Sequence, residues 1–152
     1  MTSHGKSIAI AGVAVRVVAD TNVLVSGALW PGPSHRIIEL AEAGEVILCV
    51  TETMIEELKG VLQRRKFQAR LRALRTSPEE ILSSLLPLAE LYEPIDASGT
   101  VPPDPDDEMF IACAVSAGAA VIISGDDHLL RLKQHGTIRI VRPTEFLRLI
   151  EK

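Results

Sequence analysis

The chain has 152 residues, a formal net charge of −4 at pH 7, and 47% hydrophobic but only 3% aromatic residues. A chain of this kind is expected to form one domain with an aliphatic core and to bury roughly 68–70% of its unfolded surface. No apolar run reaches the ~18 residues of a transmembrane helix, so we expect no membrane partner.

Residues 1–13 are predicted to be a flexible tail or an extension of the first strand, and residues 14–152 to form a single domain. Lys6 and the apolar residues after it faintly resemble a signal peptide. Arg16 interrupts that run and cleavage nearby would damage the first strand, so secretion is disfavoured. Cys49 and Cys113 lie in apolar segments without a second Cys or a His at metal-ligand spacing. We therefore expect buried free thiols and a cytoplasmic location.

The first predicted element is a buried strand over residues 15–19. It contains four apolar residues, three of them β-branched, and it ends at Asp20-Thr21-Asn22. A carboxylate at the C-terminal end of such a strand lies where open α/β sheets place their ligands. Taken alone, Asp20 has a second interpretation, because Asp is also a preferred N-cap residue of helices.

Apolar periodicity, turn residues and helix caps predict alternating helices and strands after Asp20. The helices are expected over residues 23–30 and 35–43, from Thr51 or Thr53, over 81–91, and from residues 106, 128 and 143. The strands that follow the first one are expected over 46–50, near 92–95, over 119–123 and over 138–141. Residues 96–105 are rich in Pro, Gly and Asp and are predicted to form a surface loop. This alternation predicts a parallel sheet with helices on both faces.

Several residues are predicted to begin or end these helices. Ser34 is the expected cap of the helix over residues 35–43. Ser77-Pro78-Glu79-Glu80 has the form of a capping box. Gly118 and Gly136 are expected to end the helices that start at residues 106 and 128.

Four acidic residues are predicted to meet at one edge of the sheet. Asp20 and Asp126 each follow a buried strand, Asp107 opens a helix, and Glu57 lies in the first turns of the helix after the second strand. Two carboxylates about 4 Å apart repel by roughly 4 kcal/mol at an effective dielectric of 20. The sequence around them offers few Lys or Arg residues, so a divalent, oxygen-seeking ion such as Mg²⁺ or Mn²⁺ is the economical way to offset that repulsion.

Basic and acidic residues are segregated along the chain. Residues 59–75, here called the basic segment, hold seven basic side chains and no acidic one: Lys59, Arg64, Arg65, Lys66, Arg70, Arg72 and Arg75. Residues 76–130 hold eleven Asp and Glu and no Lys or Arg. A block of like charge predicts either phosphate binding or docking on an acidic protein, and the sequence leaves both open.

The acidic motifs resemble those of PIN-domain nucleases. The motifs are Asp20-Thr21-Asn22-Val23-Leu24, Ile55-Glu56-Glu57-Leu58, Asp106-Asp107-Glu108-Met109-Phe110 and Ser124-Gly125-Asp126-Asp127-His128. The resemblance spans residues 15 to 146 and is most similar to toxins of bacterial toxin–antitoxin pairs, the relatives of VapC-type ribonucleases. It implies a three-layer α/β/α sandwich with a central, mostly parallel sheet, and it makes Asp20, Glu57, Asp107 and Asp126 the catalytic metal ligands. Asp106 and Asp127 are the neighbours that an assignment shifted by one residue would select.

The resemblance implies a metal-dependent endoribonuclease that uses one or two Mg²⁺ or Mn²⁺ ions to activate water and stabilise charge on the phosphate. RNA is the implied substrate, and an antitoxin and a homodimer are the implied partners. Thr21, Asn22 and Ser124 are expected to orient carboxylates or waters. The basic segment, through Arg64, Arg65, Lys66 and Arg70, is the predicted RNA-binding surface.

Three other functions are weighed against this one. A haloacid-dehalogenase-like phosphatase needs a second Asp two residues after the first, and this chain has Asn22 there. A Rossmann nucleotide-binding module needs a glycine-rich turn after the first strand, which the chain lacks. The serious alternative is a non-catalytic, PIN-like module that binds RNA or protein, although such a module need not keep all four acids.

Overall fold

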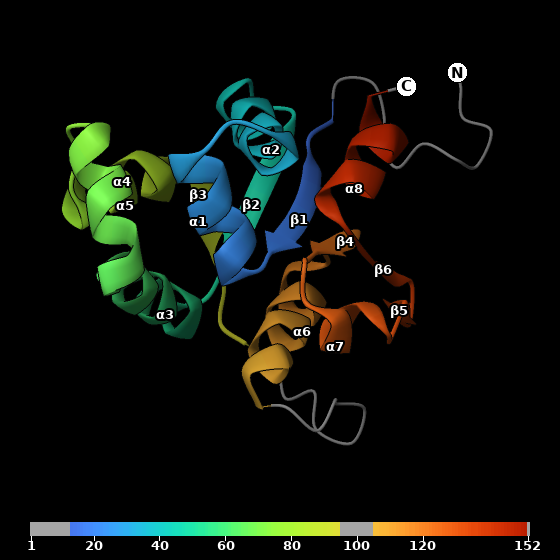
Figure 1. Ribbon diagram of the computed structural model, residues 1–152. Helices are drawn as coiled ribbons and strands as arrows, with labels where there is room; N and C mark the ends of the chain where they lie inside the picture. The colour runs from blue at the N-terminus through green and yellow to red at the C-terminus, as the bar shows by residue number, and fades with distance from the viewer. Residues whose placement is uncertain (1–12, 95–104, 152) are drawn as a thin grey trace.

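The computed structural model describes residues 13–94 and 105–151, with side chains described from residue 107 in the second range. A central sheet lies between helices on both of its faces, so the predicted three-layer α/β architecture is confirmed (Figure 1). Most of the tail predicted over residues 1–13, and the loop predicted over 96–105 apart from Pro105, lie outside the described residues. No helix of the described ranges is long and apolar enough to cross a bilayer.

Within the described residues, the sheet has six strands in the order β3-β2-β1-β4-β6-β5. All neighbouring strands are parallel except β5 and β6, which are antiparallel. The strands are β1 (Val15–Ala19), β2 (Val46–Val50), β3 (Ala89–Leu91), β4 (Val121–Ile123), β5 (Gln134–His135) and β6 (Ile138–Val141).

The helices fall into two groups according to the face of the sheet that they cover. The first face packs against α1 (Thr21–Leu29), α2 (Pro33–Glu42), α3 (Glu52–Leu62), α4 (Gln68–Ala73), α5 (Pro78–Leu85) and α8 (Pro143–Ile150). The second face packs against α6 (Pro105–Ala117) and α7 (Asp127–Leu130). Two short 3₁₀ turns are also present: η1 (Arg65–Phe67) precedes α4, and η2 (Leu86–Leu88) follows α5.

Strand β1 shows why both faces must be covered. Val15, Val17 and Ala19 belong to the core under the first group of helices, whereas Val18 belongs to the core under α6 and α7. Successive side chains of a strand point to opposite faces, so a strand that is apolar at nearly every position needs a layer on each side. Only Arg16 departs from this pattern, and its Nε donates to the Tyr92 hydroxyl at 2.9 Å at the surface.

Strands β1, β2 and β6 have the predicted bounds, while the region after α5 was predicted wrongly. The helix expected over residues 81–91 ends at Leu85, and the strand expected near 92–95 lies at Ala89–Leu91. Pro87 accounts for both differences. Proline has no N–H for the helical ladder, so the α-helix gives way to a 3₁₀ turn at Leu86–Leu88 and the chain reaches β3 sooner.

Two predicted helix boundaries are also wrong. Ser34 lies inside α2, which is capped by Gly32 with Pro33 in its first turn. Gly136 does not end a helix, because α7 ends at Leu130; Gly136 has a φ of 60° and lies between the antiparallel strands β5 and β6. Strand β5 was not predicted, because a strand of two residues is too short to show a hydrophobic alternation.

Other boundaries are confirmed. Ser77 caps α5, and its Oγ accepts from the Glu80 N–H at 3.1 Å as a capping box requires. Thr51 rather than Thr53 caps α3. Gly118 follows α6 with a φ of 64°, a conformation that favours glycine. Lys59 of the basic segment lies in α3, which ends at Leu62, and the rest of the segment continues into η1 and α4.

The strand order changes direction beside β1. From β1 the chain moves outward to β2 and β3 on one side, and then crosses to β4 on the other side of β1. In open α/β sheets, ligands bind in the crevice outside the carboxyl ends of strands at such a switch point. Asp20 directly follows β1, and Ser124 directly follows β4. The topology therefore brings two candidate site segments together.

Gly27 provides a test of this architecture. A Cβ at Gly27 would lie 2.6 Å from the Ser34 carbonyl oxygen and 2.9 Å from Ile38 Cδ1, since α1 and α2 approach closely there. We expect Gly27→Ala to lower the free energy of unfolding by about 1–3 kcal/mol in urea titrations. Gly60→Ala in α3 is the matched control, because its Cβ meets nothing within 4 Å. That control should be neutral or stabilising by up to about 1 kcal/mol, and equal losses in both variants would contradict the packing argument.

Candidate active site

Asp20 is a helix cap, which is one of its two sequence interpretations, and it also lies at the end of β1, where the other interpretation expects a ligand. Its Oδ1 accepts a hydrogen bond from the Val23 N–H at 2.8 Å and so caps α1. Its Oδ2 accepts from Ser124 Oγ at 2.6 Å across 104 residues of sequence. The residue is only 5% exposed. Capping α1 therefore fixes the orientation of a buried carboxylate at the switch point.

Ser124 also ties Asp126 to this centre. Its Oγ accepts from the Asp126 N–H at 2.9 Å, and Asp126 Oδ1 in turn accepts from the His128 N–H at 2.7 Å and caps α7. The neighbouring Asp127 is bound elsewhere, with its Oδ1 3.0 Å from Arg142 Nη2 and its side chain 73% exposed. These contacts favour Asp126 over Asp127 as the site residue.

Glu57 is joined to the residue after Asp20. Thr21 Oγ1 donates to Glu57 Oε1 at 2.5 Å, which connects α1 to α3. Both residues line an open pocket of about 200 Å³, together with Asp20. The complete lining is Asp20, Thr21, Asn22, Glu57, Val61, Arg64 and Phe110. Sequence reasoning had no signal for Val61 and Phe110, which look like ordinary core residues of their helices.

Asp107 is 3% exposed and lies in α6 on the second face of the sheet. It precedes Phe110 by three residues, and residues three apart share one side of a helix. Asp107 therefore lies on the side of α6 that reaches the pocket through Phe110, although it does not itself line the pocket. The side chain of Asp106 lies outside the described residues, so the choice between the two remains a prediction.

Three of the four predicted acids are placed by two separate sets of hydrogen bonds. Asp20 is linked to Asp126 through Ser124, and Glu57 is held by Thr21. Within the described ranges, no three His, Cys, Asp or Glu side chains are grouped so that they could hold a metal ion. This edge of the sheet therefore carries several carboxylates, but those described are not grouped around one metal position.

Burial dominates the electrostatics of Asp20. Loss of hydration raises the pKa of its carboxyl above the ordinary value, and the nearby charge of Asp126 acts in the same direction. The hydrogen bonds from Ser124 and Val23 oppose the shift because they stabilise the ionised form. An unfavourable buried negative charge is a feature that a bound cation would relieve.

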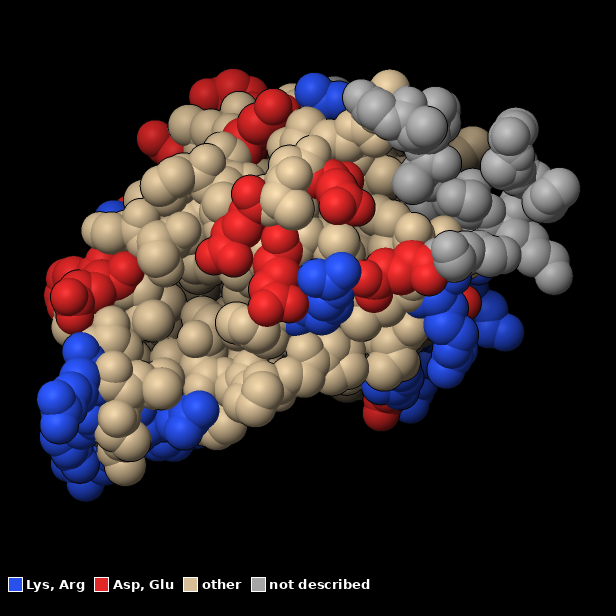
Figure 2. Space-filling view, turned by 90° about the horizontal axis from the view of Figure 1, so that it is seen from above, with Lys and Arg blue, Asp and Glu red and all other residues tan. Residues whose placement is uncertain are grey.

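The basic segment reaches the same pocket. Arg64 lines it together with Asp20 and Glu57. Most of the remaining cations of the segment lie on η1 and α4, while Lys59 lies on α3 and Arg75 follows α4. Figure 2 shows Lys and Arg gathered at the end of the molecule that carries these elements. Acidic side chains occupy the middle of the same face (Figure 2). The cations of the basic segment therefore extend from the pocket to one end of the molecule.

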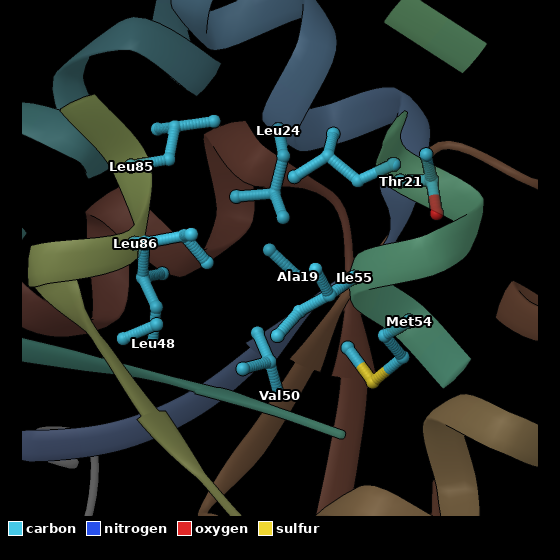
Figure 3. A pocket seen from close by; sticks show the side chains of 11 residues that line it. Ala19, Thr21, Leu24, Leu48, Val50, Met54, Ile55, Leu85 and Leu86 are labelled. Carbon is cyan, nitrogen blue, oxygen red and sulfur yellow. The ribbon is translucent and has the colours of Figure 1, made fainter. Parts of the chain in front are cut away.

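A second, small apolar pocket of about 20 Å³ lies between the sheet and the helices α1, α3 and α5. Figure 3 shows Leu24, Leu48, Ile55 and Leu85 around the hollow, with the Thr21 hydroxyl at its margin. Thr21 is the residue that this pocket shares with the acidic one. The protein thus presents an apolar and an acidic recess side by side.

Comparison with known proteins agrees with this architecture. A family model described as PIN domain matches residues 16–128, which include all four predicted acids. No protein with a curated description matches the chain. Among solved structures, a chain in the crystal structure of VapBC2 from Rickettsia felis, bound to a DNA fragment from the promoter of that pair, has a TM-score of 0.53 at 15% identity. The match covers 83% of this chain and 97% of that one, and at this identity it is a likeness of fold. Because the family model covers well over half of the sequence, the chain belongs to the PIN domain family.

Proposed function

We propose that the protein is a Mg²⁺- or Mn²⁺-dependent endoribonuclease and the toxin component of a toxin–antitoxin pair. The observation that carries this proposal is the buried carboxylate of Asp20, oriented by α1 and linked through Ser124 to Asp126 at the switch point of the sheet. A buried negative charge lowers the stability of the folded protein unless a bound ligand compensates it. Membership of the PIN family supports hydrolysis of a nucleic acid as that use.

The donors fit a hard divalent cation in their chemistry. Asp20, Asp107 and Asp126 offer only carboxylate oxygens, which are the ligands that Mg²⁺ and Mn²⁺ prefer. Burial makes ionised Asp20 unfavourable, and a cation would reverse that preference. We assign these three residues as the ligands and Glu57, held by Thr21, as the acid beside them.

The other residues of the site orient the carboxylates and attract the substrate. When bound, the metal would make a water nucleophilic at neutral pH and stabilise negative charge on the phosphate. Ser124 and the cap of α1 fix both oxygens of Asp20, and Thr21 fixes Glu57. Arg64, at the rim of the same pocket, is positioned to attract a phosphate past the acidic residues.

A protein partner is part of the proposal. The similar fold is found in VapBC2, the toxin–antitoxin pair whose structure with promoter DNA is described above. The apolar pocket beside the site would give an antitoxin segment or a second subunit a surface to bury. We propose an antitoxin for this chain, together with a homodimer, on these grounds.

The non-catalytic PIN-like module remains the second candidate. The observation in its favour is that no three acidic side chains of the described ranges are grouped to hold a metal. A binding module would keep the fold and the basic segment while needing no ion. Metal binding and cleavage separate the two candidates.

The raised pKa of Asp20 gives a pH-dependent stability prediction. A raised pKa in the folded state means that the folded protein holds the proton more tightly, so stability falls as the pH rises through that pKa. In chelator, Asp20→Asn should melt above the parent protein at neutral pH, with the advantage shrinking as the pH falls toward about 4. Asp127→Asn, which removes a carboxylate whose side chain is 73% exposed, should show no such pH-dependent advantage. A constant difference between Asp20→Asn and the parent would contradict the burial argument.

Metal binding should raise the melting temperature of the parent protein. An ion that binds only the folded state at a hundredfold excess over Kd adds about 2.7 kcal/mol, or roughly 5–10 °C for a chain of this size. Differential scanning fluorimetry with EDTA, Mn²⁺ or Mg²⁺ measures this rise. Asp20→Asn should lose most of it, whereas Asp127→Asn should keep it. Identical melting curves for the parent in EDTA and in metal would exclude the proposed site.

Cleavage of single-stranded RNA tests the enzyme directly. Asp20→Asn, Asp107→Asn and Asp126→Asn should each lower the rate by at least about a hundredfold, since each removes a ligand charge. Glu57→Gln should be milder if Glu57 acts beside the ligands, because an amide can still accept from Thr21. Asp127→Asn is the control and should retain the parental rate. Equal loss in Asp126→Asn and Asp127→Asn would overturn the assignment within this pair.

A further inference from the structure

Trp30 is held in place by its neighbours and still reaches solvent. It follows the last residue of α1 and is 39% exposed. Its ring lies 6.1 Å from that of Phe67, tilted by 59°. The Arg70 guanidinium lies 5.5 Å from the centre of the indole, and its Nε donates to the Leu29 carbonyl at 2.7 Å. An exposed indole fixed in this way is pre-organised for a flat ligand.

The surroundings of Trp30 are cationic. Lys66 Nζ lies 5.1 Å from the centre of the Phe67 ring. The sequence has no acidic residue in 21–38 or in 60–75, the two stretches that supply this cluster. The cluster therefore combines aromatic faces with uncompensated positive charge, the pairing by which proteins hold unpaired nucleobases and their backbone.

The cluster is continuous with the acidic pocket. Arg64 lines that pocket and directly precedes η1, which carries Lys66 and Phe67. Helix α1 makes a second connection, because Asp20 caps its start and Trp30 follows its end. Nine helical residues span about 14 Å, a distance that a few nucleotides of single-stranded RNA can bridge.

We propose that Trp30, supported by Phe67 and Arg70, stacks on an unpaired base of the RNA whose backbone enters the acidic pocket past Arg64. This site rests on the proposed ribonuclease function and extends it by assigning a base-binding position remote from the acids. Stacking is tolerant of sequence because every base has a flat aromatic face. The site would select single-stranded over double-stranded RNA, in which the bases already stack on one another.

The chain's only tryptophan makes the site directly observable. Parent protein in EDTA is titrated with a single-stranded oligoribonucleotide, the same strand in a duplex, and inorganic polyphosphate as a polyanion without bases. The single strand should quench Trp30 fluorescence, the duplex should quench it far less, and polyphosphate should leave it unchanged. Equal quenching by polyphosphate, or no quenching by RNA that binds in a separate anisotropy assay, would overturn the proposal.

Variants give a second readout through anisotropy of labelled RNA in EDTA. Trp30→Ala should weaken single-strand affinity roughly tenfold or more, and Trp30→Phe, which keeps a ring, should weaken it less. The salt dependence should be unchanged in both, because stacking releases no counterions. Arg64→Gln should instead flatten the log–log salt slope by about 0.7.

Leu74→Ala is the matched control, since Leu74 is an apolar residue of the basic segment with 41% exposure and no aromatic ring. It should bind RNA as the parent does, and a loss equal to that of Trp30→Ala would overturn the stacking role. If Trp30→Ala does not fold, Trp30→Phe and the quenching titration still decide the question.

The outcome is separable from that of the proposed function, because the binding assays need neither metal nor cleavage. Quenching without any nuclease activity would leave the base site standing and overturn the enzyme. Fluorescence that changes with protein concentration but not with RNA would mean that Trp30 lies in a protein–protein contact, which overturns the base site.

Discussion

The hydrogen bond from Ser124 to Asp20 joins the two halves of the chain at the point on which the candidate site depends. It connects the residue after β1 with the residue after β4, strands that neighbour each other only because the chain reverses direction across the sheet. The same hydroxyl accepts from the Asp126 N–H. One buried side chain therefore sets the position of Asp20 and of the backbone that carries Asp126.

Much of this arrangement follows from local sequence, and the parts that do not follow are long-range. The apolar run before Asp20 predicts a buried strand, and strand–helix alternation predicts that Asp20 and Asp126 share an edge. Strand β5 and the end of α5 at Leu85 were not predicted from the sequence. A strand of two residues is too short to show a hydrophobic period, and Pro87 changes the backbone geometry without changing that period. The contact between Thr21 and Glu57 depends on how α1 and α3 pack, which no local pattern encodes.

Helix α1 organises both the chemistry and the recognition that we propose. Its start fixes the carboxylate of Asp20, its first residue, Thr21, lines both the acidic and the apolar pocket, and its end leads to Trp30. Its packing on α2 is close enough that only glycine fits at position 27. The helix has no charged residue, so it connects Asp20 at its start with Trp30 after its end without adding charge of its own.

The dual use of Asp20 has an evolutionary consequence. Its carboxylate serves the fold as a helix cap and the site as a charge, and asparagine caps helices as well as aspartate does. A single base change in the codon would thus remove the charge and keep α1 intact. The same holds for Asp126 at the start of α7. Descendants that lose the proposed chemistry and keep the scaffold for binding are therefore one substitution away, and that substitution leaves the helix caps in place.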